Sequence, residues 1–195
     1  MSARVHRYST SSEFADIYEK NGGLTEYYYR RFGDDLKDVI FHDDKATQLR
    51  GIDKTLVFNH GVEVTVDEKV DSYDSGNFAL ETATDVRKPY SSWLFTSEAD
   101  YVPYAFTRGL VHPFPLKALR GSYNSHYLPD GNHEWTKYIA PVQNVNYTGA
   151  IFKMPKELLM NEVYRYECAN RAAPMWHLFR QCIWGDEWNA KGKDI

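Results

Sequence analysis

Residues 62–70 read VEVTVDEKV, and apolar and polar side chains alternate along them. Such alternation is typical of a β-strand with one buried and one solvated face. Because successive side chains point to opposite faces, the odd-numbered residues share one face and the even-numbered residues share the other. Asp67 and Lys69 are therefore expected to project together, about 7 Å apart along the strand.

The segment before this strand completes a hairpin. Residues 52–58 are rich in β-forming residues, and Asn59-His60-Gly61 is a turn signal between the two strands. Pairing of the two strands would bring Asp53 beside Asp67 and Lys69. The two acids and the lysine would then lie together at the edge of a sheet.

The rest of the chain predicts short strands and helices. We expect further strands at 39–41, 78–82, 93–95, 101–106 and 144–152, and helices at 11–20, 24–32, 115–120, 155–160 and 171–188. Pro103 predicts that strand 101–106 is irregular or lies at a sheet edge. The sequence thus predicts an α/β fold in which helices flank a central mixed β-sheet. We expect a single domain, with a core of roughly residues 11–160 and a helical C-terminal extension over 161–195.

Composition narrows the class of protein. Hydrophobic residues make up 43% of the 195 residues and aromatic residues 15%, which is enough apolar material for a buried core. No apolar run approaches the ~20 residues of a membrane helix, and residues 1–10 do not resemble a secretory signal. Cys168 and Cys182 form no CxxC pair, so we expect a reducing cytoplasm rather than a disulfide framework or a cysteine zinc site.

Two carboxylates and a lysine at one sheet edge suit the hydrolysis of phosphodiester bonds. Asp53 and Asp67 could hold a hard divalent cation such as Mg²⁺ through oxygen ligands. Such a metal polarises a phosphoryl oxygen and lowers the pKa of a bound water. Lys69 could orient that water or stabilise the charge of the transition state. The alternation alone is also explained by an exposed hairpin with solvated charges.

Three short segments, QLRGID (48–53), VTVDEKV (64–70) and FALE (78–81), resemble the PD-(D/E)xK nuclease superfamily, including small members carried by phages. In that superfamily an acid on one strand precedes a (D/E)xK triplet on the next, although here Ile52 stands where the family name has proline. The resemblance implies a restriction-endonuclease-like core in which Asp53 and Asp67 bind Mg²⁺ or Mn²⁺ and Lys69 is the catalytic lysine. It also implies the backbone carbonyl of Glu68 as a further metal ligand, a homodimer, and the cytoplasm of a bacterium or a phage-infected host.

Several other residues have two interpretations each. Gln48 could hydrogen-bond a metal-bound water or a phosphate, or be a surface glutamine. Glu81 could be a further acid near the metal or a charge at the end of a strand. Arg50, Arg87 and Lys88 are candidate contacts to a nucleic-acid backbone, and solvated surface charges otherwise. His126 and His133 do not have the spacing of a standard zinc ligand pair, so we expect them to be ordinary loop histidines.

The sequence therefore predicts a metal-dependent nuclease, specifically a DNA endonuclease. Its net charge of −4 counts against nucleic acid as the partner, because phosphate binding usually leaves a basic surface, although a bound metal supplies local positive charge. The rival functions are a catalytically inactive nucleic-acid-binding protein on the same fold and a phage inhibitory or structural protein. Three acid oxygens grouped closely enough for one ion would favour the enzyme.

Overall fold

The computed structural model describes residues 18, 21–71, 73–83, 85, 87–88, 92–106, 109–126, 133–143, 148–171, 173–180 and 182–188. The predicted hairpin is confirmed, and both of its strands are interior strands of the larger of two sheets. Strand β2 (Lys54–Phe58) pairs antiparallel with β3 (Glu63–Val66), and Leu56 lies opposite Val64. Gly61 has a φ of 77° in the connecting turn, a conformation that glycine adopts at no steric cost.

The hairpin belongs to a mixed seven-stranded sheet. Its order is β1-β2-β3-β6-β7-β10, and β4 also pairs with β6. The remaining strands are β1 (Leu36–Phe41), β4 (Lys69–Asp71), β6 (Tyr101–Phe106), β7 (Gly109–Pro115) and β10 (Asp186–Trp188). Strand β6 runs parallel to β3 and β4 and antiparallel to β7, which makes the sheet mixed.

The predicted continuous strand 62–70 is interrupted at Asp67 and Glu68. On the β6 side, Val66 is the register partner of Tyr101 and Lys69 is the partner of Tyr104. The interruption therefore lies opposite Pro103, which has no N–H to donate to a neighbouring strand. Of the two alternatives predicted from Pro103, the sheet edge is wrong because β6 is a central strand, and the irregularity is found as a gap in the pairing opposite the missing donor.

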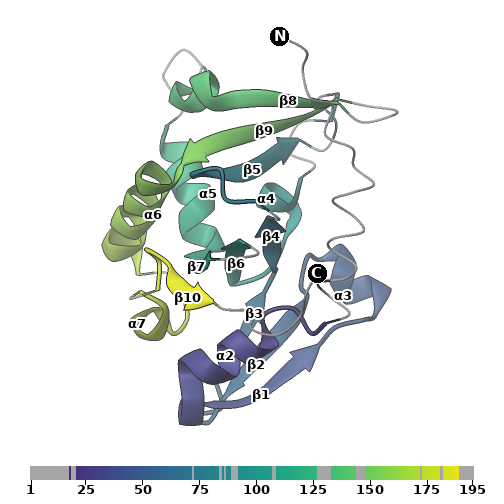
Figure 1. Cartoon of the computed structure of the whole chain (residues 1–195), viewed down its shortest axis with the longest axis vertical. Helices are drawn as coiled ribbons and strands as arrows, with labels where there is room; N and C mark the ends of the chain where they lie inside the picture. The colour runs from purple at the N-terminus through teal and green to yellow at the C-terminus, as the bar shows by residue number, and fades with distance from the viewer. Residues whose placement is uncertain are drawn as a thin grey trace.

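A second, three-stranded sheet lies at one end of the molecule (Figure 1). It consists of β5 (Asn77–Ala83), β9 (Thr148–Pro155) and β8 (Ile139–Gln143), all antiparallel, in the order β5-β9-β8. The strand expected at 78–82 thus exists, but it is paired with β9 rather than with the hairpin. Helices α5 (Leu116–Ser125) and α6 (Lys156–Asn170) lie beside each other in Figure 1, with α6 at the side of the molecule. The two sheets also contact each other directly, because the N–H of Ala79 on β5 donates to the hydroxyl of Tyr104 on β6.

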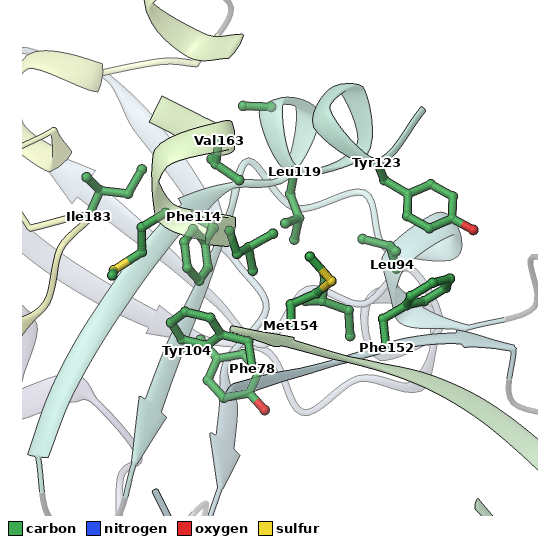
Figure 2. Close-up of a cluster of buried hydrophobic side chains, with 14 of the residues drawn as sticks. Phe78, Leu94, Tyr104, Phe114, Leu119, Tyr123, Phe152, Met154, Val163 and Ile183 are labelled. Atoms are coloured by element: carbon green, nitrogen blue, oxygen red, sulfur yellow. The ribbon is translucent and has the colours of Figure 1, made fainter. Parts of the chain in front are cut away.

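The apolar core consists of two large clusters, and the second takes side chains from both sheets, including Phe78 of β5 and Phe114 of β7. Helix α2 (Thr25–Phe32) buries Tyr27, Tyr28 and Phe32 in a cluster with Leu56 and Val64 of the hairpin. The second cluster joins β5, β9, α5 and α6 and is rich in aromatic and aliphatic side chains (Figure 2), among them Phe78, Phe114, Leu119, Phe152, Met154 and Val163. These two clusters support the prediction of an α/β fold with helices flanking a central mixed sheet.

Several sequence-based element assignments are wrong. Residues 93–95 belong to a short helix, α4 (Trp93–Thr96), since a brief apolar run does not distinguish a strand from a helix. The predicted helix 171–188 reduces to α7 (Trp176–Phe179), followed by β10. Positive φ angles at Arg171, Met175 and Gly185 stop a helix from continuing through this region.

The remaining elements complete the description. Helix α3 (Lys45–Leu49) and strand β7 were not expected from the sequence, and short 3₁₀ helices cover Gly33–Asp35 and Glu134–Tyr138. The helix expected at 11–20 lies outside the described residues except for Tyr18. In the described part of the chain, no helix is long and apolar enough to cross a membrane.

Candidate active site

The site begins where β2 and β3 meet at one end of the hairpin. Asp53 directly precedes β2, and Asp67 directly follows β3. The N–H of Asp53 donates to the carbonyl of Val66 at 2.9 Å, although the register partner of Val66 is Lys54. Asp53 and Lys54 thus both face Val66 across the strand pair. This arrangement resembles a β-bulge, a feature that redirects side chains.

The carboxylate of Asp53 turns back onto the opposite strand. Its Oδ2 accepts a hydrogen bond from the N–H of Glu68 at 2.6 Å. Glu68 stands between Asp67 and Lys69 in the chain, so this bond brings Asp53 to the (D/E)xK triplet. The structure thus places Asp53, Asp67 and Lys69 together.

Asp67 is the most buried member of the group. Its N–H donates to the carbonyl of Tyr101 at 3.0 Å, which fixes the backbone where the strand pairing is interrupted. Its side chain is 2% exposed, and Oδ1 accepts a hydrogen bond from the ammonium of Lys69. The hydroxyl of Ser97 lies within hydrogen-bonding reach of the carboxylate, but the buried Oδ2 makes no hydrogen bond of normal geometry among the described residues. Burial raises the pKa of Asp67, and Asp53 adds to this effect, while Lys69 opposes it.

Lys69 lies at the mouth of the site, with 27% of its side chain exposed. Besides Asp67, its Nζ lies 3.4 Å from the backbone carbonyl of Glu68 and 5.6 Å from the ring centroid of Trp93. Burial alone would lower the pKa of Lys69, but the carboxylates of Asp67 and Asp53 outweigh this effect and raise the pKa. Lys69 is therefore protonated at neutral pH and available as a cationic donor.

The side chain of Glu68 points to the opposite face of the strand, as the alternation predicts. Its Oε1 accepts from Nζ of Lys54 at 2.6 Å, and its Oε2 accepts from the N–H of Leu24 at 3.2 Å. Burial raises the pKa of Glu68, and Lys54 opposes that effect. The glutamate side chain is thus committed to the interior, and only the main chain of Glu68 faces the site.

Residues far away in sequence close the site. Arg120 of α5 donates to the carbonyl of Leu94 at 2.5 Å and to that of Ser97. Burial lowers the pKa of Arg120, and the Asp67 carboxylate opposes this, so the two charges lie within electrostatic reach. Ser97 in turn donates to the carbonyl of Gly51 at 3.0 Å. No local motif marks Trp93, Ser97 or Arg120, so sequence analysis had no signal for them.

Gly51 explains the tight approach of this loop to the site. It has a φ of 66°, and a Cβ atom there would lie 2.8 Å from the Cβ of Ser97. A larger residue would therefore push the Gly51-Ile52-Asp53 segment away from α4. The glycine of the quoted QLRGID segment has a packing role beside Asp53.

Gln48 and Glu81 both lie near the site but in different ways. Gln48 lines a cavity of about 230 Å³ together with Asp53, Lys54 and Glu68, whereas Asp67 and Lys69 are not part of its lining. Glu81 belongs to the second sheet, yet its carboxyl is close enough to Lys69 for the two charges to interact. Burial raises the pKa of Glu81, and Lys69 opposes that rise.

The three candidate nucleic-acid contacts are surface residues. Arg50 pairs with Glu98 at 2.7 Å, and both side chains are more than half exposed. Arg87 pairs with Asp85 at 2.6 Å, and Lys88 forms an isolated β-bridge with the same Asp85. These residues lie outside the group formed by Asp53, Asp67 and Lys69.

The two loop histidines have local structural partners. His133 is buried, and its ring hydrogen-bonds the carbonyl of Tyr123 at 2.8 Å and accepts from the N–H of Trp135 at 3.0 Å. His126 lies 2.6 Å from a carboxylate oxygen of Glu134. Both nitrogens of His133 are therefore occupied within the fold.

The donor set at the hairpin fits a hard divalent cation. Asp53, Asp67 and the carbonyl of Glu68 are all oxygen donors, and the unpartnered Oδ2 of Asp67 is a buried acceptor that an ion would satisfy. Among the described residues, however, no group of three His, Cys, Asp or Glu side chains is placed to hold a metal. The site as predicted has only two acid side chains, Asp53 and Asp67, and its third oxygen would come from the main chain of Glu68.

No protein-family model, curated protein or solved structure matches the chain.

Proposed function

We propose that this protein is a metal-dependent nuclease with a restriction-endonuclease-like core that hydrolyses phosphodiester bonds in DNA as an endonuclease. The observation that carries the proposal is the buried, unpartnered Oδ2 of Asp67 beside Asp53 and a protonated lysine. A purely structural ion pair would satisfy its buried oxygens, because an unmade hydrogen bond costs about 1–3 kcal/mol.

Each residue has a distinct role in this proposal. Asp53, Asp67 and the Glu68 carbonyl would hold Mg²⁺ or Mn²⁺, which supplies a polarised phosphoryl oxygen and an activated water when bound. Lys69 is the cationic donor to the phosphate, since its ammonium is partly exposed and stays protonated. Gln48 lines the adjoining cavity, where its amide would hydrogen-bond water or phosphate. Glu81 keeps a negative charge near Lys69 and so favours the ammonium form.

The arrangement of the strands supports the same class. Asp53 and Asp67 lie at the adjoining ends of the paired strands β2 and β3, where the mixed sheet changes from antiparallel to parallel pairing. Homodimer formation and a cytoplasmic location remain part of the proposal, as the family resemblance implies them.

A cleavage assay tests the proposal directly. Labelled duplex, branched and single-stranded DNA, and RNA, are incubated with the wild-type protein in EDTA, Mg²⁺ or Mn²⁺. We expect metal-dependent cleavage of DNA that Asp67→Asn abolishes and Asp85→Asn, a change in an exposed ion pair, leaves intact. Binding of DNA without cleavage in any metal would instead favour the inactive nucleic-acid-binding protein, and neither binding nor cleavage would favour a phage structural or inhibitory protein.

A further inference from the structure

A second lysine–carboxylate pair lies directly behind the site. Nζ of Lys54 is 2.6 Å from Oε1 of Glu68, and the two side chains are 5% and 6% exposed. Lys54 follows Asp53 in the chain, and Glu68 lies between Asp67 and Lys69. Every residue of the proposed site is therefore covalently next to a member of this buried pair.

The pair is held by further directional contacts. Lys54 also donates to the carbonyl of Gly22 at 3.1 Å, and the N–H of Leu24 donates to Glu68. Gly23, with a φ of 55°, packs so closely that a Cβ atom there would collide with both charged groups. The segment 22–24 thus packs directly against the pair, although Lys54 and Glu68 also line the cavity beside Asp53.

Stability alone does not account for such a pair. Burying two charges carries a large desolvation cost, and apolar side chains of similar volume often stabilise a fold equally well or better. What a hydrogen-bonded pair adds is a defined position for the chain segments that carry it. Backbone pairing defines that position only in part, because the Asp67 N–H bonds the carbonyl of Tyr101 while the ladder with β6 is interrupted at Asp67 and Glu68, opposite Pro103.

We propose that Lys54 and Glu68 are positioning residues that fix the main chain of Asp67 and Glu68 against Asp53, so that the metal-binding oxygens converge. The Glu68 N–H bond to Asp53 is the contact through which this acts. The role in metal binding rests on the function proposed above, whereas the role in fixing the main chain does not.

The test separates position from stability with a double substitution, Lys54→Met/Glu68→Leu. An apolar pair of similar size should keep the protein folded, with a melting temperature at or above that of either single variant. Amide hydrogen exchange in EDTA should nevertheless show the amide of position 68 in the double variant exchanging at least about tenfold faster than in the wild type, with the Leu56 amide in the middle of β2 as the internal reference. Calorimetry should show the affinity for Mn²⁺ falling by about 10–100-fold, as expected when groups behind metal ligands are changed.

Matched variants make the outcomes distinct. Arg50→Met/Glu98→Leu removes an exposed ion pair and should change neither readout. The proposal would be overturned by a folded double variant whose amide at position 68 exchanges at the wild-type rate and whose affinity for Mn²⁺ equals that of the wild type. If the wild type binds no Mn²⁺ but the amide of position 68 exchanges faster in the double variant, the proposed metal site is wrong while the positioning role stands.

A milder variant covers loss of folding. Glu68→Gln keeps the shape and the acceptor oxygen but removes the charge, so the Glu68→Gln chain should fold and its position-68 amide should exchange several-fold faster than in the wild type. Unchanged exchange in Glu68→Gln, together with a double variant that does not fold, would make the pair structural only and so overturn the positioning role.

Discussion

Two lysine–carboxylate pairs lie back to back on the same short segment, and they differ in what their atoms touch. The Lys54–Glu68 pair is closed from solvent, and both carboxylate oxygens of Glu68 accept hydrogen bonds. The Lys69–Asp67 pair keeps one lysine partly exposed and one buried carboxylate oxygen without a partner among the described residues. The fold supplies hydrogen bonds to both carboxylate oxygens of Glu68, while one carboxylate oxygen of Asp67 makes none among the described residues. The same chemistry on opposite faces of one strand therefore serves structure on one side and a site on the other.

The largest expected effect on stability comes from removing one partner of the buried Lys54–Glu68 pair. Lys54→Met leaves the Glu68 carboxylate buried without its cation, which typically costs about 3–5 kcal/mol of folding free energy. Urea denaturation at neutral pH measures this loss. Lys117→Met, an exposed lysine on α5, is the matched control and should change stability little. A Lys54→Met protein as stable as wild type would mean that the two pairs do not differ as described.

A substitution of the lysine in the Lys69–Asp67 pair should change the cleavage activity rather than the affinity for metal. Lys69→Ala removes the cationic donor and should lower the cleavage rate about 10²–10³-fold, the usual effect of deleting one transition-state donor. Binding of Mn²⁺, followed by calorimetry, should persist, because a protonated lysine donates no lone pair to a metal. Cleavage by the variant at the wild-type rate would exclude Lys69 from the chemistry.

His112 is a further buried titratable group, and the fold keeps its imidazole neutral instead of pairing it with an opposite charge. Burial lowers its pKa to about 4, and its Nδ1 lies 3.1 Å from the carbonyl of Ile183. The folded protein keeps His112 neutral while the unfolded chain takes up a proton, so stability is fully present above about pH 6.5 and falls as the pH drops toward 4. The shift from 6.5 corresponds to a loss of roughly 3 kcal/mol.

Urea denaturation across this pH range tests the role of His112. His112→Gln should lose most of the acid-side slope, while His60→Gln, in the exposed hairpin turn, should retain it. An identical pH dependence in wild type and His112→Gln would show that other groups control acid stability.

The smallest effect is expected at the exposed pair. Arg50 and Glu98 are 56% and 57% exposed, so Arg50→Ala should change stability by less than about 1 kcal/mol. If Arg50 contacts the nucleic-acid backbone, the variant should bind DNA more weakly, and the salt dependence of binding should fall by about one unit of slope. Fluorescence anisotropy at several salt concentrations measures both, and an unchanged slope would make Arg50 a solvated surface charge only.

Sequence analysis succeeded where local pattern determines structure. The alternation of residues 62–70, together with the Asn59-His60-Gly61 turn, was sufficient to predict the hairpin and the common face of Asp67 and Lys69. It failed where distant partners decide. The interruption at Asp67 depends on β6, and the short helix at Trp93 was indistinguishable from a strand by its residues alone.

The same limit applied to the surroundings of the site. Arg120 and Ser97 reach it through tertiary packing, and Lys54 is buried only because Glu68 and residues 22–24 meet it there. None of these contacts leaves a periodic or motif-like trace in the chain, since each joins residues from separate elements.

The parallel pairing of β3 with β6 has a consequence for how fast the molecule folds. The hairpin joins near neighbours and can form within microseconds, but Asp67 acquires its backbone partner only when Tyr101 arrives from a distant part of the chain. The last strand of the large sheet, β10, comes from residues 186–188 and docks on β7. Contacts between such distant segments slow folding, because loop closure must precede the favourable interactions. Refolding followed by Mn²⁺ uptake should therefore lag behind formation of the hairpin, because the backbone of Asp67 is fixed only after Tyr101 has docked, in a nearly complete molecule.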